Sequence, residues 1–193
     1  MIVGKETTIA SDARVRLAVS LNEDANQTAV QICVHEHALR LWQAYEMSYP
    51  KREVATALVR PKPTCEKTGK KIVLIDDVFP GRYLKSGEGS GGITADTFSC
   101  WSGLMAARYT DSSSVMLGWA HSHPNIKIFM SQADVMVHQA AFSAADHLVA
   151  LITDPHKPIS ASRFFAWEKG QRAICDVHFE WPAWCDEFGQ LTC

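Results

Sequence analysis

The chain has 193 residues, of which 47% are hydrophobic, 21% are charged and 9% are aromatic. That composition is typical of a folded globular protein, and it excludes a collagen, a coiled coil and a disordered chain. Nineteen lysine and arginine residues against twenty-one aspartate and glutamate residues give a net charge of −2. A balance this close to neutrality does not favour a general binder of nucleic acid or of membrane surfaces.

The sequence carries no signal for export, membrane insertion or division into domains. No apolar segment of signal-peptide length follows the first basic residue, Lys5. No run of about 18 apolar residues that could span a bilayer is present. We therefore expect a cytoplasmic location, no membrane partner, and six cysteines that remain free thiols. Because we find no repeat and no linker, we expect one domain over residues 1–193.

The first half of the chain is predicted to combine strands with one long helix. Apolar residues recur at helical spacing from residue 28 onward, and Pro50 is expected to end that helix. Two apolar runs follow, and the prolines between them exclude an interior strand at that point. In chain order, the predicted elements are a strand near 15–19, a helix over 28–47, a strand over 53–59, a break over 60–63 and a strand over 72–79.

A glycine-rich segment opens the second half, and helices and strands alternate after it. The segment over 80–92 contains five glycines, without the Gly-Lys-Ser/Thr ending of a phosphate loop, so we expect a mobile flap there. The remaining predicted elements are a helix over 94–109, a strand over 115–121, a helix over 131–145, a strand over 147–153 and a half-buried strand over 173–179. Together they predict an α/β fold in which a mixed β-sheet is flanked by helices.

Two histidines at the end of the strand over 115–121 form the most informative motif. His121 and His123 stand two positions apart, and residues two apart on a strand point to the same face. They can therefore offer two imidazole nitrogens to one metal ion. Pro124 follows at once and is expected to stop the strand.

A carboxylate follows at a distance that lets the chain fold back onto these histidines. Ser131 and Asp134 are spaced like the N-cap and first turn of a helix, which would bring the Asp134 carboxylate near both imidazoles. Two imidazoles and one carboxylate leave a tetrahedral ion one open position, as in catalytic zinc sites. We therefore predict one Zn²⁺ per chain, held by His121, His123 and Asp134, with a pair of core histidines as the alternative.

The other histidines and the cysteines lack such an arrangement. His35 and His37 also form a His-x-His, but they fall within the predicted helix, where residues two apart lie about 200° round the axis and do not chelate one ion. The histidines interpreted as structural are His138, His147, His156 and His178. A second metal site would have to come from Cys175, His178, Cys185 and Cys193, whose spacing fits no standard finger.

The motif resembles that of a known enzyme family. His-Ser-His-Pro at 121–124, seven residues between His123 and Ser131, and then Ser-x-x-Asp match the motif of the JAMM (MPN+, Mov34/JAB) zinc metalloproteases. Gly-Trp-Ala before it and Val-Ala-Leu-Ile-Thr-Asp-Pro at 149–155 are also similar to that family, so the resemblance spans about residues 28–167. It implies a cytidine-deaminase-like JAMM/MPN core and the removal of ubiquitin or ubiquitin-like proteins from their conjugates.

The resemblance also implies a role for each residue of the motif. His121, His123 and Asp134 would hold the zinc, and the Ser131 hydroxyl would stabilise the oxyanion. Glu53, which begins the strand after the first helix, matches the family's general base, although Thr56 stands where family members commonly have glycine. Other interpretations remain open: Glu46 or Glu36 as the base, Glu53 as a solvated partner of Lys51 or Arg52, and Ser131 as a simple helix cap.

The implied substrate is an extended C-terminal tail, often ending in Gly-Gly, of a ubiquitin-like partner. The flap over 80–92 lies where the family has an insertion that covers this tail, so Gly89, Ser90, Gly91 and Gly92 are the predicted substrate-binding residues. There the tail would bind as an added strand.

Several functions are compatible with this chemistry. The size of the chain is similar to that of JAMM proteins of bacterial ubiquitin-like conjugation systems, including those of antiphage defence. One alternative is a peptidase that matures the C-terminus of a ubiquitin-like or sulfur-carrier precursor. Two more distant alternatives are an inactive MPN scaffold and a DNA-associated protein of the RadC type. The sequence does not predict an oligomeric state.

Overall fold

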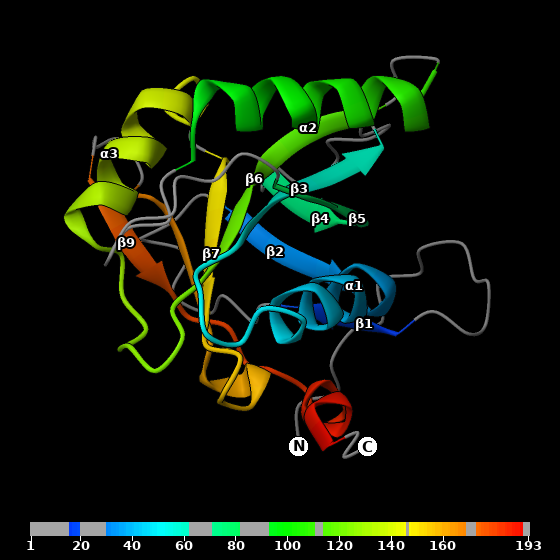
Figure 1. Ribbon diagram of the computed structural model, residues 1–193, viewed down its shortest axis with the longest axis vertical. Coiled ribbons are helices and arrows are strands. Elements are labelled where there is room, and N and C mark those ends of the chain that lie inside the picture. Colours follow the sequence, from blue (N-terminus) through cyan, green and yellow to red (C-terminus); the bar gives the residue numbers. More distant parts are fainter. Residues whose placement is uncertain are drawn as a thin grey trace.

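The computed structural model describes residues 16–19, 30–61, 71–81, 93–110, 114–145, 147–168 and 173–190, which form two β-sheets with three helices (Figure 1). The helices are α1 (Glu36–Met47), α2 (Ala95–Arg108) and α3 (Gln132–Ala141), with short 3-10 helices at η1 (Ile159–Ala161) and η2 (Ala183–Gln190). The strands are β1 (Leu17–Val19), β2 (Val30–His35), β3 (Ala55–Pro61), β4 (Lys71–Ile75), β5 (Asp77–Pro80), β6 (Ser114–Ser122), β7 (Val149–Thr153), β8 (Arg163–Trp167) and β9 (Ile174–Val177).

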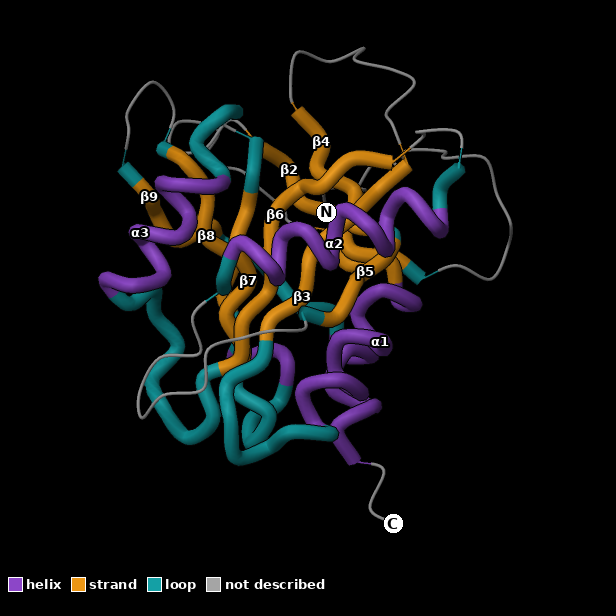
Figure 2. Tube along the Cα trace, turned by 45° about the horizontal axis from the view of Figure 1, so that its top comes forward, coloured by secondary structure: helices purple, strands orange, loops and turns teal. Residues whose placement is uncertain are grey.

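The larger sheet is mixed and has the strand order β5-β3-β6-β7-β8-β9. Its one parallel pair is β6 with β7, and the other neighbours are antiparallel. Parallel strands need a crossover, and α3 supplies the one between β6 and β7. The smaller sheet has the order β1-β2-β4. The predicted mixed sheet flanked by helices is therefore confirmed (Figure 2).

The two faces of the larger sheet carry two hydrophobic cores. On one face, Trp101 of α2 packs with inward-facing residues such as Ala57 and Trp119. On the other face, Trp42 of α1 belongs to a cluster that includes Leu58 and residues of the smaller sheet. This alternation follows from the period of two along a strand. Helices α1 and α2 consequently lie on opposite sides of the sheet at β3 and β6 (Figure 1).

Gly118 makes the close approach of β6 to β7 possible. Its φ is 151°, and a Cβ placed on it would lie 1.7 Å from the carbonyl oxygen of Val149. The pairing of β6 with β3 also shifts register beside it, between Leu58 and Val59. Only glycine tolerates both the backbone angle and the contact. The glycine three residues before His121 therefore fixes the central strand pair on which the candidate site stands.

The predicted helix over 28–47 is wrong in its first part. Residues Val30–His35 form β2, between β1 and β4, and the helix begins only at Glu36. Val30, Ile32 and Val34 are β-branched and alternate, so the same apolar residues fit a strand as well as a helix. The pair His35 and His37 therefore does not lie inside a helix, which was the premise for treating it as a control.

Two further predictions fail around the β3 region. In the break expected over 60–63, the first two residues instead belong to β3, which continues through Pro61, and residues 62–63 lie outside the described part of the chain. The pairing of β3 with β5 stops at Val59, so among the described strands Pro61 pairs with β6, where a missing N–H is tolerated at the edge. The strand expected over 72–79 is two strands, β4 and β5, which separate at Asp76 and enter different sheets.

The remaining elements follow the prediction more closely. Helix α2, strands β6, β7 and β9, and the start of α3 at Ser131 are confirmed, although α3 ends at Ala141 instead of near 145. Strand β8 was not predicted. Most of the flap, over 82–92, lies outside the described residues, and so do Gly89, Ser90, Gly91 and Gly92. Within the described part of the chain, no helix combines the length and apolar character needed to cross a bilayer.

Candidate metal centre

The two histidines of the motif lie side by side at the carboxyl end of β6. His121 and His123 are 4% and 3% exposed, and their ring centroids are 5.0 Å apart. A backbone hydrogen bond from His123 N to the Thr153 carbonyl oxygen (2.7 Å) holds the second histidine against β7 after β6 has ended. The site therefore stands at the carboxyl ends of two parallel strands, where α/β folds commonly bind ligands.

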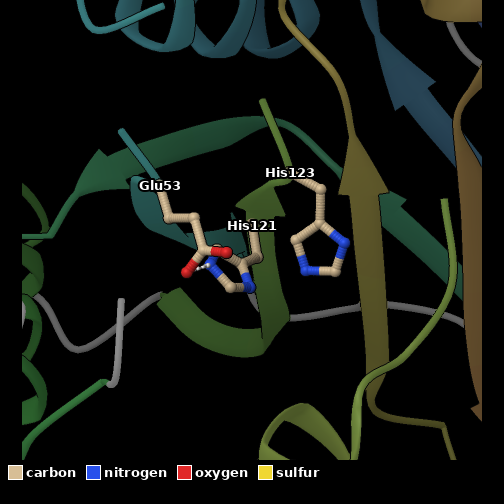
Figure 3. Close-up of side chains that lie close together, drawn as sticks. All are labelled: Glu53, His121 and His123. Carbon is tan, nitrogen blue, oxygen red and sulfur yellow. Dashed lines mark ion pairs between the residues drawn. The ribbon is translucent and has the colours of Figure 1, made fainter. Parts of the chain in front are cut away.

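Glu53 reaches the same place from the segment that leads into β3. Its Oε2 lies 3.4 Å from His121 Nε2, and a dashed line marks this ion pair in Figure 3. Glu53, His121 and His123 each offer one potential ligand atom within 4.8 Å of the others. Among the described residues, these three make up the group of histidine, cysteine and carboxylate side chains that could hold a metal ion.

Asp134 contacts both imidazoles from the first turn of α3. Its Oδ1 lies 3.1 Å from His121 Nδ1, and its Oδ2 lies 3.4 Å from His123 Nε2. The structure thus brings together all four residues that the sequence suggested for the metal and the base. Their arrangement adds one feature that the sequence did not predict: His121 lies between two carboxylates, with Glu53 at one ring nitrogen and Asp134 at the other.

Ser131 forms the N-cap of α3. Its hydroxyl oxygen accepts a hydrogen bond from Asp134 N (3.2 Å), and Asp134 Oδ2 accepts one from Ser131 N (2.8 Å). This capping box fixes the Asp134 carboxylate through its own helix start. The interpretation of Ser131 as a helix cap is therefore confirmed. The O–H of the same hydroxyl is a separate donor, so the cap does not exclude a second role.

The imidazoles and carboxylates of the cluster shift one another's pKa values. Burial alone would lower the pKa of His121, but the hydrogen bonds and charges of Asp134 and Glu53 raise it to about 9. Burial alone would raise the pKa of Asp134, but hydrogen bonds with His121, His123 and Ser131 hold it well below its usual range. Both carboxylates therefore favour a positive charge between them, carried by an imidazolium or by a cation.

The donor atoms fit a zinc ion. Two imidazole nitrogens and carboxylate oxygens are the ligands of catalytic zinc sites. His121 Nε2 is buried, and its Glu53 partner lies 3.4 Å away without good hydrogen-bond geometry. The other ring nitrogen, Nδ1, faces Asp134 Oδ1 at 3.1 Å. Imidazole nitrogens with carboxylate oxygens beside them form the donor set that a zinc ion takes, and this juxtaposition is the structural feature that favours a metal.

Ser122, between the two histidines, is a residue that the sequence reasoning missed. Its side chain points away from the imidazoles, and its hydroxyl accepts a hydrogen bond from Val54 N (3.0 Å), while Ser122 N donates to Val54 O (2.9 Å). Ser122 is fully buried. It therefore ties the strand that carries both histidines to the residue directly after Glu53. The strand alternation, which sends the middle residue of His-x-His to the opposite face, was the available signal.

The loop after the histidines is also fixed by hydrogen bonds. Asn125 adopts a positive φ of 59°, a conformation that asparagine tolerates better than most residues. Asp154, at the end of β7, accepts hydrogen bonds from Asn125 N (3.2 Å) and His156 N (3.0 Å). Phe129 then packs its ring near His123, with the centroids 5.6 Å apart. The turn from β6 into α3 is thus held from both β7 and the histidine.

The alternative bases lie in other surroundings. Glu36 pairs with Arg16 and Arg40. Glu46 is buried in α1, where its carboxylate accepts a hydrogen bond from Thr153, and burial raises its pKa to about 8. Of the candidates for the base, Glu53 is the one whose carboxylate reaches an imidazole of the motif.

The remaining histidines and cysteines lie outside the group of potential metal ligands where the structure describes them. His35 Nε2 lies 3.3 Å from Asp76, and His37 is exposed. Burial raises the pKa of the Cys185 thiol to about 12, which disfavours the thiolate that a metal needs. Cys193 lies outside the described residues. No second group of metal-ligand side chains occurs in the described part of the chain.

Comparisons with known proteins show a likeness in structure and none in sequence families. No family model and no curated protein matches the sequence. The solution structure of protein DSY2949 from Desulfitobacterium hafniense is similar, with 17% sequence identity and a TM-score of 0.51. The similarity covers 76% of this chain and 88% of that one. At this identity the likeness concerns the fold and carries no statement on function.

Proposed function

We propose that the protein is a zinc-dependent isopeptidase of the JAMM (MPN+) type. Its reaction would be hydrolysis of the amide bond after the C-terminal tail of a ubiquitin-like protein, which releases that protein from a conjugate. The observation that carries the proposal is the convergence of Glu53, His121, His123 and Asp134 at the end of β6. The spacing of the motif adds to it, because it resembles the family's motif at His121, His123 and Asp134, while Thr56 departs from the family's pattern beside Glu53.

The residues of the chain divide into two tasks. His121, His123 and Asp134 would hold the ion, and the capping box at Ser131 keeps the Asp134 carboxylate in place. A bound zinc ion supplies a Lewis acid that polarises a carbonyl group and makes water more acidic. Glu53 would accept the proton of the attacking water and deliver it to the leaving amine. The Ser131 O–H would donate a hydrogen bond to the developing oxyanion.

The surroundings of Glu53 suit a proton acceptor. Its side chain is 14% exposed, so the carboxylate is screened from bulk solvent but not sealed. The backbone after it is fixed by the hydrogen bonds between Val54 and Ser122. A base held in this way loses little conformational entropy when the substrate binds.

The test uses zinc-loaded protein and a panel of ubiquitin-like proteins ending in Gly-Gly. Each is supplied as a lysine-linked conjugate and as a linear precursor, so that isopeptide cleavage and precursor processing are separated. The wild type should cleave at least one amide, lose activity with a chelator and regain it with zinc. If the zinc-loaded wild type cleaves none of the panel, the isopeptidase proposal is wrong.

The variant Glu53→Gln tests the division of tasks. It should retain zinc and lose turnover by about 100-fold or more, because it removes the proton acceptor. Glu36→Gln is the matched control, since that glutamate is paired with arginines on α1, and its turnover should stay unchanged. Loss of zinc from Glu53→Gln would make Glu53 a ligand, and unchanged turnover would remove it as the base.

A further inference from the structure

A second contact joins β6 to α3 beside the candidate metal centre. Trp119 Nε1 donates a hydrogen bond to His138 Nδ1 (3.1 Å). Both side chains are buried, with exposed fractions of 1% and 0%. Trp119 lies two residues before His121 on the strand, and His138 lies four residues after Asp134 on the helix. The contact therefore involves the same two elements as the contact of His121 with Asp134.

The two contacts occur at matching spacings. Two residues along a strand advance about 6.7 Å, and four residues along a helix advance about 6 Å. The Trp119–His138 and His121–Asp134 contacts are both 3.1 Å long, so they form two successive cross-links between β6 and α3. The Trp119 ring also lies against the His121 ring, with centroids 5.6 Å apart. A shift of α3 along β6 would break both cross-links together.

Aromatic packing holds His138 in its orientation. The His138 ring stacks on Phe142 with centroids 5.6 Å apart and lies 5.1 Å from the Trp167 ring. Trp167 Nε1 in turn donates to the Phe142 carbonyl oxygen (2.8 Å), which fixes the end of α3. These contacts hold the His138 ring in the orientation in which Nδ1 faces Trp119 Nε1.

The chemistry of His138 is that of a neutral acceptor. Burial lowers the pKa of His138 to about 4, and a contact with the Leu148 backbone offsets this only in part. Because Nδ1 accepts from Trp119, the proton of the neutral ring is on Nε2, which has no hydrogen bond of good geometry among the described residues. An apolar side chain at this position would pack without burying a polar N–H, so packing alone does not account for an imidazole.

We propose that Trp119 and His138 form a positioning pair that sets the register of α3 on β6 and thereby holds Asp134 against His121. The pair does not touch the ion or the substrate, and it acts through Asp134. The inference rests on the proposed function only in taking Asp134 and His121 as residues of a metal site.

The test compares two substitutions of His138. His138→Leu removes the acceptor, whereas His138→Gln can still accept from Trp119 through its amide oxygen. Zinc affinity is measured by competition with a chelator, and the absorption spectrum of the Co²⁺ form reports the ligand geometry. We expect His138→Leu to bind zinc about 10- to 100-fold more weakly with an altered spectrum, as when other outer contacts of metal ligands are lost. His138→Gln should stay within about threefold of the wild type.

Phe98→Leu is the matched control, because Phe98 belongs to the same hydrophobic core but its ring contacts Trp101 and Phe142 and not the hydrogen-bonded pair itself. It should lower thermal stability without changing zinc affinity. Equal zinc affinity in His138→Leu and the wild type, or an equal loss in Phe98→Leu, would overturn the positioning role.

A readout without metal keeps this inference separate from the proposed function. In the metal-free protein, the ¹⁵N chemical shift of His121 Nδ1 reports its hydrogen bond with Asp134. It should change in His138→Leu and stay unchanged in His138→Gln. If His138→Leu does not fold, Trp119→Phe removes the N–H donor of the same hydrogen bond and should change the His121 Nδ1 shift in the same way. A wild type that binds no zinc would refute the isopeptidase proposal. A ¹⁵N shift of His121 Nδ1 that is the same in His138→Leu as in the wild type would refute the positioning pair.

Discussion

Replacing Ser122 with alanine tests whether the middle residue of the His-Ser-His motif aligns Glu53 with the histidines. The substitution removes the hydroxyl that accepts from Val54 N, while the bond from Ser122 N to Val54 O remains. Val54 is 2% exposed, so its N–H would be left buried without a partner. A buried donor in that state costs about 1–3 kcal/mol. We therefore expect Ser122→Ala to lower the free energy of unfolding by about 2 kcal/mol and Tm by about 4–8 °C.

The effect on activity should exceed the effect on zinc binding. Val54 follows Glu53 directly, so a freed backbone at Val54 lets the Glu53 carboxylate leave its place beside His121. His121 itself stays in β6, where its partner Ala55 is unchanged in register. Turnover at saturating zinc should therefore fall by about 10-fold or more, while zinc affinity changes by less than about threefold.

Stability is measured by urea denaturation of the metal-free protein, and turnover by cleavage of the best conjugate found for the wild type. Ser48→Ala is the control, because Ser48 is exposed and its hydroxyl donates to its own helix, at the Ala44 carbonyl oxygen. Ser48→Ala should change the free energy of unfolding by no more than about 0.5 kcal/mol. If Ser122→Ala matches Ser48→Ala in both stability and turnover, the hydroxyl does not align Glu53.

Three further predictions concern the frame of the site and its charges. Gly118→Ala should lower the free energy of unfolding by at least about 3 kcal/mol, because the new Cβ would collide with the Val149 carbonyl. Gly103→Ala is the control: its Cβ would meet nothing within 4 Å, and urea denaturation should show α2 stabilised by about 0.5–1 kcal/mol. Burial raises the pKa of Glu46 from 4.5 to about 8, so the folded state binds a proton that the unfolded state releases. The stability of the wild type relative to Glu46→Gln should therefore fall as the pH rises from 4.5 to about 8 and then level off; a constant difference across that range would contradict the raised pKa. Asp134→Asn keeps an oxygen for the capping box but loses the charge, and chelator competition should show zinc affinity reduced by more than about 100-fold, with wild-type affinity counting against Asp134 as a ligand.

The sequence predicted the elements whose periodicity was unambiguous. The capping signature at Ser131 and the apolar runs of β6 and β7 are local features, and they sufficed to place the histidines and Asp134 near one another. The apolar residues of Val30–His35 fitted the spacing of a helix and that of a strand. The strand forms because β1 and β4 pair with this segment, and that pairing is not encoded in the local pattern. The separation of β4 from β5 is likewise decided by which sheet each strand joins, and no pattern within 72–79 encodes that.

The contacts that fix the site were less accessible from the sequence, because they join residues far apart in the chain. Ser122 and Val54 are 68 positions apart, and nothing in the spacing of either indicates the other. His138 was interpreted as structural because it lacks a ligand partner, and the structure does place it outside the group of potential ligands. Its proximity to Trp119 follows only once the register of α3 on β6 is known.

The sequence predicted Asp134 as a metal ligand and, through the family resemblance, Glu53 as the base, and the structure shows how that division can be tested. His121 Nδ1 already has a partner in Asp134 Oδ1 at 3.1 Å, whereas the buried Nε2 has none of good geometry among the described residues. A histidine that binds a metal through one nitrogen usually donates from the other to a carboxylate. Because Glu53 and Asp134 lie at opposite nitrogens of the ring, one carboxylate is on the side of the ion and the other orients His121. In the proposed site, Asp134 Oδ2, 3.4 Å from His123 Nε2, is the ligand oxygen, which puts the ion on the Asp134 side of the ring. An ion at Nε2 would instead have Glu53 as its ligand and Asp134 as the orienting carboxylate. On this reasoning Asp134→Asn loses zinc and Glu53→Gln keeps it, and the reverse result would exchange the roles of the two carboxylates.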